Sequence, residues 1–336
     1  MSDLEEKLIK NPHSFEMERV PEFEQHKTFY SSYQIDQLKE RLFEKTTKNL
    51  KTFQVCDRRC YCAIWHPESN VLSIGSGDYR ALIWNYETSE ILHEYQERDL
   101  VNFTMWSPDG KKFIYGTEDG FIKIQDTENN EVSKVLDLRS SVEAIDCSPD
   151  GVKIVSGQGN GSVIIHDIQT WELLSSYQHG KLCNTVCWSN DGSIIVSGGH
   201  DKVVIIWDVE TGRIRMKIDA HDDFVRCVKI TKDKKKIYSS GDDGKIKIWS
   251  TQTGEQLAIL VSEIMAVRTL DLSPNGKLLL YGGEDGVIKI FDVSSSKELL
   301  SAKTHKGVLR YAKWNKDGSL FATAGFDGKV NVHRWH

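Results

Sequence analysis

Short runs of alternating apolar and polar residues recur along most of the chain, and each run ends in a comparable pair of residues. The seven pairs are Trp84-Asn85, Gln125-Asp126, His166-Asp167, Trp207-Asp208, Trp249-Ser250, Phe291-Asp292 and His333-Arg334. Successive pairs lie 41, 41, 41, 42, 42 and 42 residues apart. Alternation with a period of two is typical of β-strands, and a fixed spacing indicates an internal repeat. The pattern therefore predicts seven copies of one β-structured unit.

A turn-forming residue stands six positions before each of these pairs. These residues are Asp78, Asp119, Asn160, Asp201, Asp243, Asp285 and Asp327. Glycine follows directly in five of the seven copies, and Asp-Gly or Asn-Gly between strand-like runs is a strong hairpin signal. A second turn, such as Pro149-Asp150-Gly151, recurs earlier in most copies. Each copy is therefore predicted to hold three strands in a meander.

A fourth strand is predicted after the terminal pair, for example at 172–177 and 255–260. Four antiparallel strands in about 42 residues, repeated seven times, match the blade of a β-propeller. The chain is thus predicted to be all-β, with seven blades of four antiparallel strands each.

The Trp207-Asp208 pair and the hairpin from Asp201 to Trp207 resemble the WD40-repeat family, over about residues 48–336. The resemblance implies a buried hydrogen-bond relay in which a histidine, a serine or threonine, the turn aspartate and the tryptophan are joined. The matching residues are His179, Ser197, Asp201 and Trp207 in the fourth copy, and His221, Ser239, Asp243 and Trp249 in the fifth. Because a satisfied polar network fixes one arrangement, blades four and five are expected to be the most rigid.

The seventh copy is not followed by an outer strand of its own, whereas Lys48–Val55 precedes the first copy and has strand character. Pairing this segment with the last blade would close the ring, as the resemblance implies, and would remove two open sheet edges. Residues 1–47 then form an N-terminal extension, with an amphipathic helix predicted at about 33–47 from its apolar stripe. Two interpretations stay open: the extension covers the flank of the propeller, or it is an arm that binds a partner.

The net charge of −6 argues against a direct nucleic-acid contact, which is usually made by a basic domain. No run of about 18 apolar residues is present, so membrane insertion is not expected. The seven cysteines lie in strand-like apolar runs. We therefore expect a reducing compartment, either the cytoplasm or the nucleus.

Cys56, Cys60, Cys62 and His66 are spaced like metal ligands, but alignment of the copies places Cys60 and Cys62 where other copies have apolar residues. Cysteine at such positions behaves as a small hydrophobic residue. The glycine-rich segments lie in hairpins without a following helix to bind phosphate. We therefore predict no metal, no cofactor and no catalytic residue.

The resemblance places partner binding on the face that carries the hairpins between second and third strands. Arg226, Arg268 and Arg310 occupy one equivalent position near the channel in copies five to seven. Either Arg226 pairs with Asp242 and Arg268 with Glu284, or the arginines are available to carboxylates or phosphates of a partner. Phe224, Phe326 and Trp171 complete the candidate surface, because arginine and aromatic residues are enriched at binding hot spots. For Trp171, packing against the neighbouring blade is an equal alternative.

Together these features predict a non-catalytic scaffold or adaptor within a multiprotein complex. Its partners, other proteins or peptides, would bind the rim of blades five to seven and, on the second interpretation of residues 1–47, the N-terminal extension as well. Two alternatives stay open: a recognition module for a phosphorylated or acidic peptide, and a subunit that meets nucleic acid only indirectly, in a ribonucleoprotein assembly.

Overall fold

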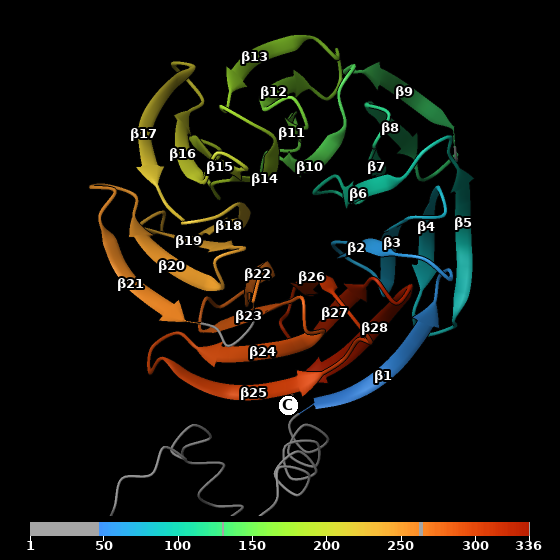
Figure 1. The fold of residues 1–336 in the computed structure, drawn as a ribbon. Coiled ribbons are helices and arrows are strands. Elements are labelled where there is room, and N and C mark those ends of the chain that lie inside the picture. Colours follow the sequence, from blue (N-terminus) through green and yellow to red (C-terminus); the bar gives the residue numbers. More distant parts are fainter. Residues whose placement is uncertain (1–46, 130, 262–264, 336) are drawn as a thin grey trace, which may run out of the picture.

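Seven four-stranded antiparallel sheets surround a central axis in the computed structural model, which describes residues 47–129, 131–261 and 265–335 (Figure 1). In blades one to six, the strands follow one another in chain order from the axis outward. The all-β, seven-bladed propeller predicted from the repeat is confirmed. The helix predicted at 33–47 falls almost entirely outside the described residues, and its last residue, Thr47, begins strand β1.

The strands are regular in length and equivalent from blade to blade. The innermost strands are β2 (Cys60–Trp65), β6 (Val101–Trp106), β10 (Val142–Cys147), β14 (Cys183–Trp188), β18 (Val225–Ile230), β22 (Val267–Leu272) and β26 (Leu309–Trp314). The second strands are β3 (Val71–Ser76), β7 (Lys112–Thr117), β11 (Lys153–Gln158), β15 (Ile194–Gly199), β19 (Lys236–Gly241), β23 (Leu278–Gly283) and β27 (Leu320–Gly325). The third strands are β4 (Arg80–Asn85), β8 (Phe121–Asp126), β12 (Ser162–Asp167), β16 (Val203–Asp208), β20 (Lys245–Ser250), β24 (Val287–Asp292) and β28 (Lys329–Trp335). The outer strands are β5 (Glu90–Gln96), β9 (Val132–Asp137), β13 (Leu173–Gln178), β17 (Arg213–Asp219), β21 (Gln256–Val261), β25 (Lys297–Lys303) and, in blade seven, β1 (Thr47–Gln54).

Neighbouring blades pack closely because the second strands carry glycine near their ends. A Cβ atom added to Gly198 of β15 would lie 2.5 Å from Val225 Cγ1, in the innermost strand of the next blade. A Cβ atom added to Gly116 of β7 would likewise lie 2.4 Å from Val142 Cγ1 in the next blade. A side chain at these positions would therefore push the blades apart.

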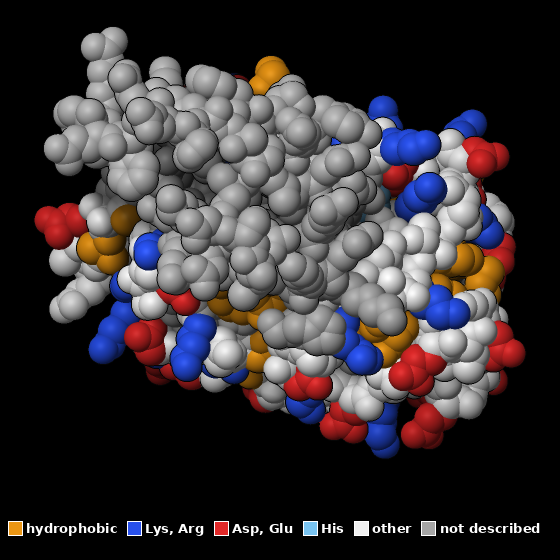
Figure 2. Space-filling model, turned by 90° about the horizontal axis from the view of Figure 1, so that it is seen from below, with side chains coloured by type: hydrophobic (Ala, Val, Ile, Leu, Met, Phe, Trp, Pro, Cys, Tyr) orange, Lys and Arg blue, Asp and Glu red, His pale blue; other side chains and the backbone are white. Residues whose placement is uncertain are grey.

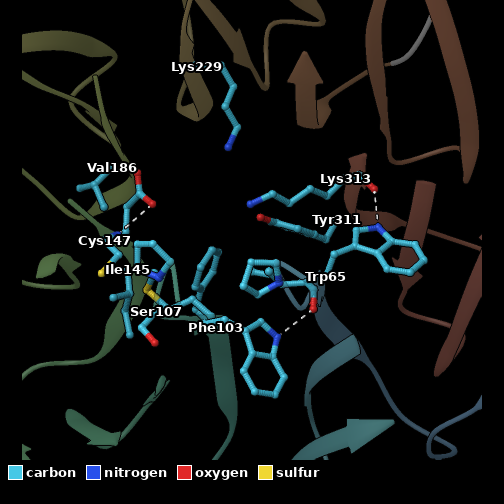
Figure 3. A pocket seen from close by; sticks show the side chains of 15 residues that line it. Trp65, Phe103, Ser107, Ile145, Cys147, Val186, Lys229, Tyr311 and Lys313 are labelled. Atoms are coloured by element: carbon cyan, nitrogen blue, oxygen red, sulfur yellow. Dashed lines mark hydrogen bonds between the residues drawn. The ribbon is translucent and has the colours of Figure 1, made fainter. Parts of the chain in front are cut away.

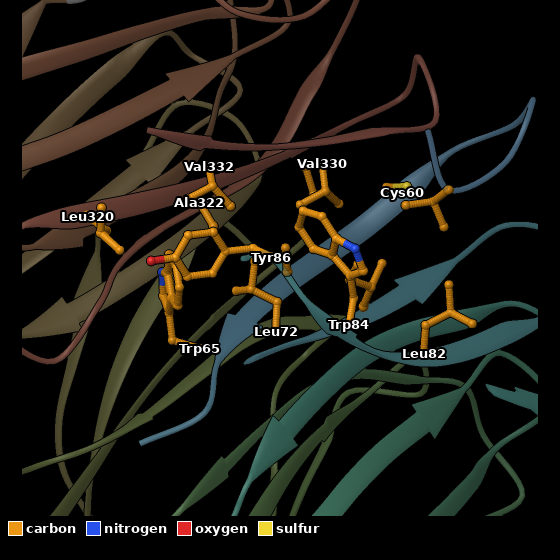
Figure 4. Packing of buried hydrophobic residues seen from close by; sticks show 14 residues of the cluster. Cys60, Trp65, Leu72, Leu82, Trp84, Tyr86, Leu320, Ala322, Val330 and Val332 are labelled. Atoms are coloured by element: carbon orange, nitrogen blue, oxygen red, sulfur yellow. The ribbon is translucent and has the colours of Figure 1, made fainter. Parts of the chain in front are cut away.

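Strand β1 closes the ring by pairing antiparallel with β28, the third strand of blade seven. The register runs from Thr47 opposite Trp335 to Gln54 opposite Lys329. Phe53 stacks on Trp84 of blade one, with ring centroids 4.8 Å apart. Side chains from the first and last parts of the described chain thus share one hydrophobic cluster (Figure 4), which also includes Leu72, Leu320, Val330 and Val332.

Blades four and five each contain a complete buried relay. In blade five the carboxylate of Asp243 accepts the Nδ1 proton of His221 at 2.9 Å. The neutral His221 Nε2 then accepts from the Ser239 hydroxyl at 2.7 Å, and Ser239 Oγ accepts from Trp249 Nε1 at 2.8 Å. Blade four contains the same series of hydrogen bonds. His179 Nε2 accepts from the Ser197 hydroxyl at 2.7 Å, and Trp207 Nε1 donates to Ser197 Oγ at 2.7 Å. The carboxylate of Asp201 accepts from His179 Nδ1 at 2.9 Å.

Blade two replaces the relay with a different network. Glu97, Tyr115 and Gln125 occupy the positions that histidine, serine and tryptophan hold in blade four. The Tyr115 hydroxyl donates to Glu97 at 2.8 Å, and Gln125 Nε2 donates to the Tyr115 oxygen at 3.3 Å. Lys123 forms an ion pair with Glu97 at 2.6 Å. The interior of blade two is therefore polar, and its hydrogen bonds and ion pair replace the relay, although Gln125 Oε1 has no partner among the described residues.

Blade seven carries His333 at the position of the tryptophan, and this residue makes the fold sensitive to acid. Burial, with a smaller contribution from His305, lowers the pKa of His333 from 6.5 to about 3. Between these values the unfolded chain binds a proton that the folded chain does not, so stability falls as the pH drops below about 6.5. His333 also stacks on Phe321, with ring centroids 4.8 Å apart.

Replacing His333 with phenylalanine is expected to reduce this acid sensitivity while preserving the stack. Between about pH 7.5 and pH 5, the original chain should lose about 2 kcal/mol more unfolding free energy than His333→Phe does. Urea titrations of both proteins at the two pH values measure this difference. Equal losses in both chains would contradict the assignment.

Candidate functional site: the two mouths of the central channel

A β-bulge in every innermost strand decides which side chains face the axis. The register of each innermost strand against its second strand shifts between the first and third residues, as between Val142 and Ala144 of β10. The bulge reverses the alternation of side chains along the strand. The second residue therefore lies at one mouth of the channel, and the third and fifth residues face the axis towards the other mouth.

At the first mouth, two of the three predicted arginines are paired. Arg226 Nε donates to Asp242 at 2.7 Å, and its Nη2 makes a second bond to the same carboxylate. Arg268 Nη2 donates to Glu284 at 2.6 Å. The sequence had left paired and available arginines as alternatives, and the structure shows pairing for these two residues.

Arg310 differs from its neighbours because no hydrogen bond or ion pair to it occurs within the part of the chain that the structure describes. Burial, followed by the charges of Arg226 and Arg268, lowers the pKa of Arg310 below its ordinary value of 12.5. Glu143, across the mouth, opposes this shift. Burial in turn raises the pKa of Glu143. Arg310 is therefore a guanidinium whose five N–H donors are available.

The aromatic residues at this mouth are already in contact with other side chains. The guanidinium of Arg59 lies 4.6 Å from the ring centroid of Phe326, and Tyr61 packs edge-on against the same ring at 5.9 Å. Phe224 stacks on His200 at 3.9 Å and lies beneath Arg226. Arg59, which the sequence reasoning missed, joins Arg226, Arg268 and Arg310 in what we call the arginine mouth. Arg59 lies in the turn that enters β2, outside the strand position that was compared between copies.

Trp171 lies apart from the arginine mouth, on the turn before β13. Its backbone φ of 64° matches that of Gly212, at 67°, in the equivalent turn of the next blade. The indole is half-buried and packs against the hydrophobic cluster formed by blades two and three, below the ammonium of Lys112. The geometry thus supplies a packing role for Trp171, and its use by a partner stays a prediction.

The second mouth contains a cavity of about 200 Å³ that the sequence reasoning did not identify (Figure 3). Phe103 and Tyr311, at the third positions of β6 and β26, pack edge-on at 5.7 Å and line it. Lys229 and Lys313, at the fifth positions of β18 and β26, also line it. A signal was present, because charged residues inside short apolar strands recur in one register: Asp146, Lys229, Asp271 and Lys313. We call this end of the channel the lysine mouth.

Of the four residues that resembled metal ligands, Cys60 and Cys62 belong to the core, whereas Cys56 and His66 are half-buried. Cys60 and Cys62 are fully buried in two hydrophobic clusters, and the His66 ring packs edge-on against Trp106 at 4.8 Å. Among the described residues, no group of three or more His, Cys, Asp or Glu side chains is arranged to hold a metal ion. Within the same ranges, no helix is long and apolar enough to cross a membrane.

A family model described as "WD domain, G-beta repeat" matches the chain at residues 171–208, 212–250, 254–292 and 296–334. Each matched unit starts near the outer strand of one blade and ends with the third strand of the next. The fold and these four repeats define a β-propeller of the WD-repeat class. Residues 171–334 thus contain four WD40 repeats within a seven-bladed propeller, and propellers of the WD40 family generally mediate protein–protein interactions without catalysis. A comparison with curated proteins found no match.

Proposed function

We propose that this protein is a non-catalytic scaffold of an intracellular multiprotein complex and binds a partner protein at the arginine mouth. The observation that carries the proposal is Arg310, which lies beside Arg226 and Arg268 and has no ion-pair partner among the described residues. Arg310 is only partly buried, so its guanidinium can donate to an acceptor that a partner brings, and such charge-assisted bonds are among the stronger ones.

The distribution of charge supports binding on one side of this mouth. Glu118 and Glu143 lie on blades two and three, whereas the arginines lie on blades five to seven and before blade one. Asp242 and Glu284 neutralise two of those arginines, so Arg310 and Arg59 retain positive charge beside Phe326. On the flank of the ring in Figure 2, by contrast, acidic and basic side chains are intermixed. The arginine mouth therefore has a negative side and a positive side, and a partner with the complementary charges would bind in one orientation.

A second candidate function follows from the same residue. Arginine donates two parallel hydrogen bonds to carboxylate or phosphate, so Arg310 also suits an acidic or phosphorylated peptide. The two functions differ in their ionic-strength dependence, because a single charged contact on a short peptide is screened by salt more strongly than an extended interface with an apolar centre.

Replacing Arg310 and Phe326 together with alanine is expected to remove the partner in affinity purification from cells, because it deletes the available cation and its aromatic neighbour. The melting temperature should change little, since Arg310 makes no ion pair within the described ranges and Phe326 is only partly buried. Quantitative mass spectrometry of co-purified proteins measures the loss.

Arg213→Ala is the matched control, because Arg213 is exposed on outer strand β17, away from the mouth. Partners that are lost with the double variant and kept with Arg213→Ala would support the proposal. Partners retained by a folded double variant would refute it. A chain lacking residues 1–45, which keeps β1, tests separately whether the extension recruits partners.

A further inference from the structure

The cavity at the lysine mouth is built from residues of six blades. Its walls include Phe103, Met105 and Trp106 from blade two and Ile145 from blade three, and Pro67 and Pro108 lie beside it in the loops that follow β2 and β6. At about 200 Å³ it is smaller than the pockets of about 300–1,000 Å³ that take drug-sized ligands. It can therefore hold a single functional group with a few attached carbons.

Three polar groups converge on this cavity. Figure 3 shows Lys313 and Tyr311 extending side by side into it and Lys229 pointing in from another wall. Within the part of the chain described by the structure, neither ammonium group nor the Tyr311 hydroxyl makes a hydrogen bond. The nearest partner is Asp271, whose carboxylate lies 3.8 Å from Lys229 Nζ, beyond hydrogen-bond length.

Each of the two nearby carboxylates uses one oxygen to bind the wall, while Asp271 Oδ1 faces Lys229 in a long ion pair. Asp146 Oδ2 accepts the backbone N–H of Trp188 at 2.8 Å, and Asp271 Oδ2 accepts that of Trp314 at 3.0 Å. Both bonds join one blade to the next, so the aspartates have a role in blade packing. The two lysines make no hydrogen bond of this kind between blades among the described residues. Burial lowers the pKa of Lys313, and the charge of Lys229 adds to the effect.

The charges of the cavity favour a monoanion over a dianion. Two lysines and two aspartates sum to zero, so a bound carboxylate leaves one net negative charge, whereas a phosphate dianion would leave two in a poorly solvated site. The aromatic and aliphatic walls complement the carbon chain of an organic acid. A carboxylate would receive hydrogen bonds from Lys313, Lys229 and Tyr311 while its carbon chain contacts Phe103 and Met105.

We propose that the lysine mouth is a binding site for an organic carboxylate, supplied either as a small molecule or by the chain terminus or side chain of a peptide. The site lies at the opposite end of the channel from the arginine mouth. It is therefore independent of the function proposed above, and Arg310→Ala/Phe326→Ala should leave it intact.

The test measures protection of Lys313 in the full-length protein. Reductive methylation with formaldehyde and a borane reductant labels accessible lysines without releasing a carboxylate, and mass spectrometry reports the modification of Lys313 with and without a probe. The probes are phenylacetate, its neutral analogue phenylacetamide, inorganic phosphate, and an acetylated Gly-Gly-Phe peptide with a free or an amidated carboxyl end. We expect the carboxylates to protect Lys313 and both amides to fail. Protection by the free-acid peptide alone would identify a protein terminus as the source, and equal protection by phenylacetate would indicate a small molecule.

Lys313→Met separates binding from folding. Calorimetric titration with the protecting carboxylate should show binding weakened about tenfold or more, with a melting temperature that is unchanged or higher, because a half-buried ammonium without a hydrogen bond is removed. Lys313→Arg should restore part of the affinity. The control Lys316→Met, on an exposed turn of the same blade with a side chain 72% exposed, should bind normally. The proposal is wrong if no carboxylate protects Lys313, if the amides or phosphate protect it equally, or if Lys313→Met binds like the control.

Discussion

A chain that begins at Asp57, and therefore lacks β1, is expected to lose its cooperative unfolding transition. The truncation removes the pairing of β1 with β28 and the stack of Phe53 on Trp84. Net backbone hydrogen-bond contributions of about 0.5–1.5 kcal/mol each, together with about 2 kcal/mol for the phenylalanine, amount to about 5 kcal/mol or more. This is comparable with the whole stability of many domains. The same deletion opens the edge of β28 and the cluster around Val330 and Val332 to solvent.

Circular dichroism melts and size-exclusion chromatography measure the effect of this truncation. We expect a broad transition without a defined midpoint, accompanied by aggregation through the unpaired edge of blade seven. The matched control is a chain that begins at Thr46, which retains all of β1 and should melt cooperatively. A sharp melt at the same temperature in both truncated chains would show that ring closure contributes little.

The second large effect concerns the relay of blade five. Asp243→Ala is expected to lower the free energy of unfolding by about 3 kcal/mol, because buried donors lose their acceptor. The Asp243 carboxylate accepts from His221 Nδ1 and from the backbone N–H groups of Asp222 and Lys245, both at 3.1 Å. The His221 side chain is fully buried, so water cannot replace the lost acceptor.

The control for this substitution is Asp285→Ala, at the equivalent turn of blade six. Asp285 is exposed, and its carboxylate accepts from the backbone N–H of Val287 at 3.0 Å. Its removal should cost about 1 kcal/mol or less. Urea unfolding of both variants makes the comparison. Similar losses for the two substitutions would mean that the turn, and not the relay, is what Asp243 stabilises.

The fold was predictable because its signals are local. A strand, its turn and the next strand lie within about 15 contiguous residues, and hairpin chemistry depends on the side chains at the turn itself. The Asp-Gly and Asn-Gly pairs, the alternating runs and the repeat spacing all report on such short segments. Closure of the ring by an N-terminal strand was also expected, and the predicted segment differs from β1 by one residue at each end.

The candidate sites were predictable only in part. The equivalent positions of Arg226, Arg268 and Arg310 followed from counting along the repeat, but their partners did not, because identical spacing allows paired and unpaired arginines alike. An acidic residue lies opposite Arg226 and opposite Arg268, whereas Phe326 lies at the equivalent position opposite Arg310. The guanidinium of Arg59 packs over the ring of Phe326. Only the folded arrangement brings Arg59 from the turn before β2 to the last blade.

The lysine mouth shows most clearly what tertiary structure adds. Strict alternation along β26 would place Arg310 and Lys313 on opposite faces, yet both lie along the channel, because the bulge between Leu309 and Tyr311 reverses the alternation. The residues of the cavity come from blades that are far apart in the chain. Strand pattern, turns and repeat number are local properties of the amino-acid sequence. The direction of each channel side chain and the partners it meets depend on backbone irregularities and on closure of the ring, which brings distant residues into contact.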